Sequence, residues 1–190
     1  LYEDTIRSVD SFLDRLVRTT SNDDPIIAVH SDHGEAFGEH GIYGHHGHLY
    51  EENIHVPLVI SGVDESETIE RPISLTALPS LLTSAAIGSV LPAPKGTVLS
   101  RTRGASRIAV RTHDLKYIVT NPESGRGCEE VYDLVSDPTE SRGRVEKNGA
   151  VAEEGRKIVR QRLAHEEEIR SIFSSADRMV EQALSSQRAN

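Results

Sequence analysis

The strongest constraint in this 190-residue sequence is a short apolar run that ends in a polar, glycine-rich segment. The run IIAVH, residues 26–30, is too short for a helix. Continuous apolar runs of this length are typical of central strands in a parallel sheet covered on both faces. Asp32, His33 and Gly34 follow directly, and in open α/β sheets ligands bind where the loops leave the carboxyl ends of the strands. The sequence therefore predicts a site in the loop after this strand.

Histidine is concentrated in this loop. Seven of the nine histidines lie between His30 and His55, whereas a solvated polar loop would be expected to use Ser, Asn and Lys. Asp32 and His33 offer a carboxylate oxygen and an imidazole nitrogen, a ligand pair that suits Zn, Mn, Mg or Ca. Further imidazoles could stabilise a developing oxyanion or protonate a leaving group, and they are supplied by His45, His46 and His48.

Several other residues of the loop are expected to have structural roles. We expect His40 to brace the loop and His48 either to contact substrate or to pack over Tyr50. Glu51 and Glu52 are expected to bond backbone amides and so to hold the loop in place. The single cysteine, Cys128, has nothing near it in the sequence that is typical of an activated thiol and is interpreted as structural or incidental.

The rest of the chain alternates helical and extended patterns. Apolar residues at helical spacing predict an amphipathic helix over residues 2–18, and residues 54–61 read as a second strand. Residues 72–86 suggest a helix that is irregular at Pro79. Three short extended runs predict an antiparallel meander: residues 107–113, 115–120 and 129–134. From about residue 151 the pattern is helical.

These elements predict an α/β fold made of three parts. We expect a partial doubly wound sheet over residues 1–100, a small antiparallel β subdomain over 101–141, and a helical tail over 142–190. Two strands with one or two covering helices fall short of a complete doubly wound sheet, whose central strands need neighbours on both sides. The first hundred residues are therefore interpreted as half of a larger sheet.

Composition excludes several classes of partner. The formal net charge of −9 argues against nucleic acid and against an anionic membrane surface, since both require a positive field. No apolar run approaches the roughly 18 residues of a membrane span, and there is no signal-peptide pattern. A lone cysteine implies no disulfide, so we expect a cytoplasmic protein. The acid excess, with arginine far outnumbering lysine, suggests a composition typical of a high-salt cytoplasm.

Three motifs carry a family resemblance. The block SDHGEAFGEHGIYGHHGHLYEENIHVPLVIS, residues 31–61, resembles the SDHGE, GEHG, LYEE and VPLII block of sulfatases and their phosphohydrolase relatives in the alkaline-phosphatase-like superfamily. TALPSLLTSAAI, residues 76–87, resembles the helix that follows in that family. LKYIVT, EEVYDL and DPTE, within residues 115–140, are similar to its C-terminal subdomain. The resemblance spans roughly residues 1–141.

The resemblance implies an alkaline-phosphatase-like fold and a metal-dependent hydrolase of sulfuric esters. Asp32 and His33 would bind one divalent cation, commonly Ca in sulfatases and Mn or Zn in phosphodiester and phosphonate relatives. A histidine stands where the family has a lysine that contacts the ester, and two positions are possible because the loop is one residue longer. Its place falls on His45 when counted from Asp32 and on His46 when counted back from Pro57.

The family nucleophile and the aspartate pair beside it have no counterpart in this sequence. We therefore interpret the chain as the C-terminal half of a sulfatase-like protein that is inactive by itself and whose partner is the missing N-terminal half. The expected substrate is a small anionic ester. Two alternatives stay open: hydrolysis or transfer of phosphodiester, phosphonate or phosphoryl groups on the same fold, which an Asp-His ligand pair favours, and a non-catalytic remnant or subunit.

Overall fold

The computed structural model describes eight stretches of the chain: residues 2–20, 24–63, 67–89, 96–124, 127–142, 149–165, 167–168 and 171. The chain forms two compact units. The first unit comprises Leu1–His45 and Glu52–Gly96, and the second comprises His46–Glu51 and Thr97–Asn190. A short piece of the histidine loop therefore belongs to the second unit, while the loop on either side of it belongs to the first.

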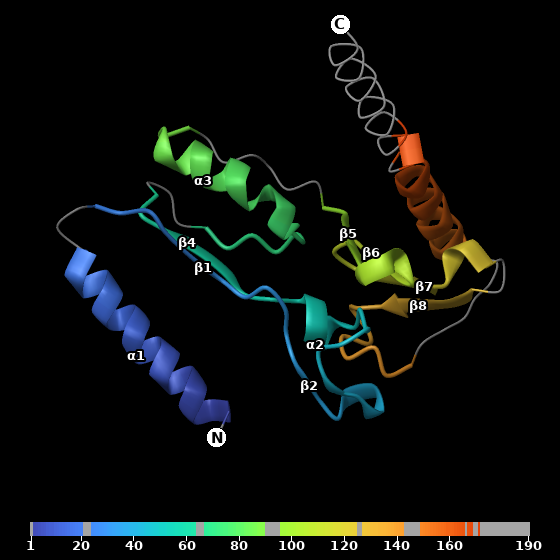
Figure 1. Ribbon diagram of the computed structural model, residues 1–190, viewed down its shortest axis with the longest axis horizontal. Coiled ribbons are helices and arrows are strands. Elements are labelled where there is room, and N and C mark those ends of the chain that lie inside the picture. Colours follow the sequence, from blue (N-terminus) through green and yellow to red (C-terminus); the bar gives the residue numbers. More distant parts are fainter. Residues whose placement is uncertain are drawn as a thin grey trace, which may run out of the picture. The chain divides into compact units, whose positions relative to one another are not determined.

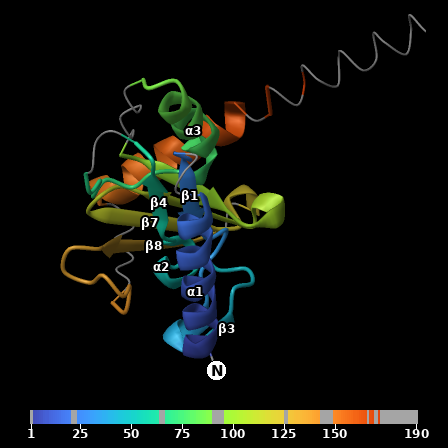
Figure 2. The same cartoon turned by 90° about the vertical axis from the view of Figure 1, so that its left-hand side faces the viewer.

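The first unit is built on two strands. β1 (Ile27–His30) pairs with β4 (Leu58–Ser61), with Val29 opposite Val59, and the two lie side by side in both views (Figures 1 and 2). The pair is antiparallel, which differs from the parallel neighbours expected from the apolar run. Between the two strands the chain forms a hairpin and a short helix before it reverses direction.

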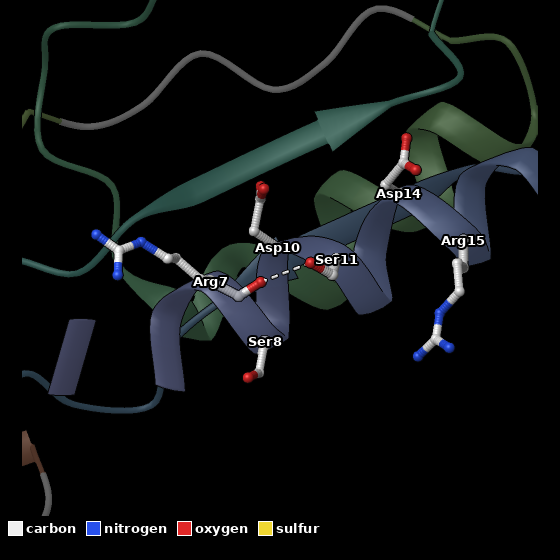
Figure 3. Close-up of a pocket in the computed structure, with 6 residues that line it drawn as sticks. All are labelled: Arg7, Ser8, Asp10, Ser11, Asp14 and Arg15. Carbon is white, nitrogen blue, oxygen red and sulfur yellow. Dashed lines mark hydrogen bonds between the residues drawn. The ribbon is translucent and has the colours of Figure 1, made fainter. Parts of the chain in front are cut away.

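Helix α1 (Tyr2–Thr20) confirms the predicted amphipathic helix and extends it by two residues. No residue of α1 is buried, and its apolar face is open at positions such as Ile6 and Phe12, each 54% exposed. Its polar face carries a shallow hollow that is lined only by side chains of α1 itself (Figure 3): Arg7, Ser8, Asp10, Ser11, Asp14 and Arg15. Among the described residues, no helix has both the length and the apolar character that a membrane crossing requires.

The loop between β1 and β4 contains short regular elements. They are β2 (Ala36–Phe37), η1 (Glu39–Gly41), β3 (Tyr43–Gly44) and α2 (Glu51–Ile54), with β2 and β3 paired antiparallel. The predicted strand over residues 54–61 is therefore wrong at its start, because residues 51–54 are helical and Pro57 lacks the N–H that a ladder needs.

After β4 the chain forms η2 (Leu75–Ala77) and α3 (Leu78–Ala86). Pro79 lies in the first turn of α3 rather than interrupting a longer helix. A proline is well tolerated there, since the first N–H groups of a helix have no intrahelical partner. The helix therefore begins next to Pro79, whereas an irregularity within a longer helix was predicted.

The second unit is a four-stranded antiparallel sheet with the order β5-β6-β7-β8. Its strands are β5 (Val98–Arg101), β6 (Arg107–Arg111), β7 (Leu115–Thr120) and β8 (Cys128–Asp133), with η3 (Arg103–Ala105) and η4 (Pro122–Ser124) in the connections. The last three strands confirm the predicted meander. The first one, β5, was not predicted.

One helix covers this sheet. Residues 150–165 are helical, as the sequence predicts, and lie beside the sheet (Figure 2). They pack through Ala152 and Val159, which join a core with Ile108 and Tyr117. Apart from residues 167–168 and 171, the later part of the predicted tail lies outside the described residues.

Gly155 offers a test of this packing. A Cβ at this position would lie 2.4 Å from Cγ of Tyr117 on β7. In an open helix Gly→Ala stabilises by about 0.5–1 kcal/mol, but here we expect Gly155→Ala to destabilise the second unit by about 1–3 kcal/mol because the aromatic ring must move. Urea unfolding of the 190-residue chain measures this. Glu154→Ala, on the exposed face, is the control, and a stabilised Gly155→Ala variant would contradict the packing.

Candidate functional site

The two predicted metal ligands lie at the start of the loop that follows strand β1. Asp32 and His33 follow the strand end, and Oδ1 of Asp32 accepts a hydrogen bond from the backbone N–H of His33 at 3.1 Å. Both side chains are open to solvent, with 85% of Asp32 and 44% of His33 exposed. The pair is therefore accessible to an ion and to a substrate.

The imidazole of His33 is oriented by its own backbone turn. Its Nδ1 lies 2.9 Å from the carbonyl oxygen of Gly34. Since a carbonyl can only accept, Nδ1 carries the proton and the Nε2 lone pair is left for a ligand. This Nδ1–H to carbonyl contact is the usual arrangement of metal-binding histidines.

The two donor atoms fit one divalent cation. Nε2 of His33 lies 3.8 Å from Oδ1 of Asp32. Two atoms separated by about 3–5 Å can both bind one ion at the usual ligand distances of about 2.0–2.6 Å. Among the described residues, no group of three or more His, Cys, Asp or Glu side chains is arranged to hold a metal. Asp32 and His33 are therefore at most part of a coordination shell.

Gly34 lets the loop approach helix α2. Its N–H donates to the carbonyl oxygen of Asn53 at 2.9 Å, and a Cβ at residue 34 would lie only 2.0 Å from the carbonyl oxygen of Glu52. Any side chain here would push the backbone away. The glycine thus holds the ligand pair against α2.

His45 lies beside the ligand pair within the first unit. Its ring stacks on the ring of His33, with centroids 3.9 Å apart and an interplanar angle of 23°. Nδ1 of His45 lies 3.2 Å from Oε2 of Glu35, so this carboxylate orients the ring. His46 belongs to the second unit and is exposed. Of the two positions that counting leaves open, the structure brings His45 together with His33.

His40 braces the loop, as predicted. Its Nδ1 lies 2.9 Å from Oε1 of Glu52, and its backbone adopts a φ of 55°, which non-glycine residues rarely take. The prediction that Glu52 bonds backbone amides is wrong, because its carboxylate instead pairs with this imidazole.

The segment His46–Glu51 is fastened to the sheet of the second unit. The Glu51 carboxylate accepts from Nζ of Lys116 on β7 at 3.1 Å and from Nε of Arg111 on β6 at 3.1 Å. The backbone N–H of Glu51 donates to Glu140, which follows β8, at 2.6 Å. The carboxylate of Glu51, which was predicted to bond backbone amides, thus pairs with two cations.

Lys116 and Glu140 form the buried centre of this network. Their side chains are 0% exposed, and Nζ lies 2.8 Å from Oε1. Burial raises the pKa of Glu140 despite the nearby ammonium. Burial also acts to raise the pKa of Glu51, but Lys116 and Arg111 outweigh it and the pKa is lowered. The sequence held a signal for this network, since LYEE, LKYI and DPTE each contribute one member.

His48 is held by residues that sequence reasoning missed. Nη1 of Arg107, on β6, donates to the carbonyl oxygen of Gly47 at 2.6 Å and contacts Nδ1 of His48. The imidazole also lies parallel to the ring of Tyr50, at 6.1 Å and 10°, which confirms the expected packing. Nothing in the local sequence connects Arg107 to His48, because 59 residues separate them.

Comparisons with known proteins match the segment that carries Asp32 and His33. The family model described as Sulfatase matches residues 1–88, which include Asp32, His33 and the whole histidine loop. The first 88 residues are thus similar to sulfatases. No curated protein matches this chain.

Solved structures extend the fold match into the second unit. A protein from Bacteroides fragilis, provisionally described as a sulfatase, is 18% identical with a TM-score of 0.64 and covers 84% of this chain and 40% of its own. A similarly described protein from Bacteroides thetaiotaomicron VPI-5482 is 21% identical with a TM-score of 0.56 and covers 77% and 38%.

A third solved structure contains a sulfated sugar. This protein, crystallised with its substrate D-glucosamine-2-N,6-O-disulfate, is 21% identical with a TM-score of 0.53 and covers 86% of this chain and 39% of its own. At these identities the likeness establishes the fold, which confirms the predicted α/β class of the alkaline-phosphatase-like type. This chain spans about 40% of the length of these structures.

Proposed function

We propose that this chain supplies part of the active site of a sulfatase-type hydrolase that cleaves small sulfuric esters. The observation that carries the proposal is the pair formed by Asp32 Oδ1 and His33 Nε2, 3.8 Å apart within the family-matched segment. A bound divalent cation would neutralise charge on the ester oxygens and favour the deprotonated nucleophile. Ca suits an oxygen-rich shell, whereas Mn, Zn or Mg would also accept this pair.

The remaining residues of the loop have distinct roles in this proposal. Asp32 and His33 hold the cation, and the turn at Gly34 fixes the ring of His33. His45, oriented by Glu35 and stacked on His33, replaces the family lysine as the group that donates to the ester or to its leaving oxygen. His46 and His48 belong to the second unit. Segments beyond this chain supply the nucleophile and the other cation ligands.

A second candidate is hydrolysis of a phosphodiester or a phosphonate monoester. His33 favours it, because sulfatases often carry asparagine at the ligand position where this chain has histidine. The fold and the cation pair serve both reactions, since each forms a trigonal-bipyramidal transition state with charge on nonbridging oxygens.

Paired hydrolysis assays test the proposal. We expect the complete protein in which this chain occurs to hydrolyse an aryl sulfate faster than an aryl phosphodiester, and to lose this activity with a chelator and regain it with a divalent cation. The 190-residue chain by itself is expected to show no turnover. A preference for the phosphodiester would favour the second candidate, and no hydrolysis of either ester would indicate a non-catalytic subunit.

A further inference from the structure

Aromatic side chains gather on the open surface of the first unit. The chain has only five tyrosines and three phenylalanines, yet Tyr2, Phe37 and Tyr43 of the first unit are all exposed. Their exposed fractions are 55%, 53% and 81%. A single exposed apolar side chain needs no explanation, whereas a contiguous group is a candidate binding surface.

The β2–β3 hairpin brings these rings together. Phe37 and Tyr43 are directly opposite each other in the strand pairing, so their side chains are neighbours on one face of the ribbon. Tyr2 meets Phe37 edge-on, with ring centroids 4.8 Å apart and an interplanar angle of 67°. A Cβ added at Gly38 would lie 3.1 Å from the hydroxyl oxygen of Tyr43, so the glycine leaves room for this ring. Phe37 and Tyr43 therefore form an aromatic platform that Tyr2 supports.

The aromatic platform adjoins the candidate site within the same unit. Glu35 and His45 each lie two residues from a platform residue, and Nδ1 of His45 is 3.2 Å from Oε2 of Glu35. The ring of His45 in turn stacks on the ring of His33, with centroids 3.9 Å apart. Two residues of chain span at most about 7 Å. An ester group held beside His33 would therefore have the rest of its molecule within reach of the platform.

We propose that Phe37 and Tyr43 bind the alcohol part of the ester and select alcohols that carry a ring with a flat apolar face, as aryl groups and sugars do. This inference rests on the proposed function. Aromatic side chains gain energy by stacking on such a face, and they carry no positive group that would attract the anion instead. An open-chain alcohol has no flat face to place on the two rings. The platform thus determines which esters bind, while the residues around His33 act on the ester group.

Kinetics of three esters test the selectivity. In the complete protein, Tyr43→Leu, which keeps bulk but removes the flat ring, should raise KM for 4-nitrophenyl sulfate, for glucose 6-sulfate or for both by about two- to tenfold, with kcat nearly unchanged. The KM for propyl sulfate should stay the same. A response of only one ring ester identifies the kind of ring that the platform accepts. An equal rise in KM for propyl sulfate, or no rise for either ring ester, would overturn the inference.

Two further variants serve as controls for Tyr43→Leu. Tyr43→Phe keeps the ring and should retain the wild-type KM for every ester, which separates stacking from a role of the hydroxyl. Ile87→Ala removes an apolar side chain that is 73% exposed in the same unit but outside the hairpin, and it should change nothing.

Binding of the unreacted alcohol separates this inference from the proposed hydrolysis. In the 190-residue chain, millimolar 4-nitrophenol or methyl glucoside should shift the NMR resonances of the Phe37 and Tyr43 rings, whereas 1-propanol should not. In Tyr43→Leu the shift at Phe37 should weaken. If the complete protein hydrolyses no ester while a ring alcohol still shifts these resonances, the proposed function fails and ring binding by the platform is supported. Resonances that neither ring alcohol shifts would overturn the platform.

Discussion

Replacing Asp32 with alanine is expected to abolish cation-dependent hydrolysis in the complete protein and to lower the affinity for the divalent cation by more than about a hundredfold. The reason is that even residues that only orient a ligand change metal affinity by about 10–100-fold, and Asp32 contributes a ligand oxygen and a negative charge. Calorimetric titration with Ca and Mn, together with the metal content of the purified protein, measures the effect. His33→Ala should give a similar loss, because it removes the partner atom 3.8 Å away.

The surface pair His113 and Asp114 offers a matched control for these variants. Like the ligand pair, it places a histidine and an aspartate next to each other, with Nδ1 2.5 Å from Oδ1 and both side chains more than half exposed. Asp114→Ala should leave cation affinity and hydrolysis unchanged. If Asp32→Ala kept the wild-type metal stoichiometry, the ligand assignment would be wrong.

Lys116→Met is expected to destabilise the second unit by about 3–5 kcal/mol, the usual loss when one partner of a buried ion pair is removed. The variant leaves the carboxylates of Glu140 and Glu51 close together without the ammonium that lies 2.8 and 3.1 Å from them. The segment His46–Glu51 should also loosen, since Glu51 fastens it to β7. Urea unfolding of the 190-residue chain measures the stability, and hydrogen exchange at the amide of Glu51 reports the segment.

Two further variants separate burial from charge. Lys157 pairs with Glu154 at 3.3 Å, but both side chains are more than half exposed, so Lys157→Met should cost less than about 1 kcal/mol. The double variant Lys116→Met, Glu140→Gln should recover part of the loss, because the buried charge is removed together with its partner. Equal stability of Lys116→Met and Lys157→Met would contradict the buried network.

Helices and strands whose own residues show a clear hydrophobic pattern could be predicted from the sequence. The helix over α1 follows from apolar residues at helical spacing, and β6 to β8 follow from short β-branched and aromatic runs separated by turn residues. Strand β5 was missed because VLSR has little extended character by itself and is stabilised by pairing with β6. The antiparallel pairing of β1 was also not predictable, since a buried apolar run has the same appearance in either direction.

Adjacency in the sequence identified the proposed ligand pair, whereas contacts between distant residues position several other residues of the loop. Asp32 and His33 are neighbours at a strand end, so their chemistry and their place in the loop were readable from residue types and a motif. The choice of His45, the contact of Arg107 with His48 and the clamp of Glu51 by Lys116 needed the tertiary structure. Each depends on side chains from different elements meeting in space, and residue order alone does not encode which of them meet.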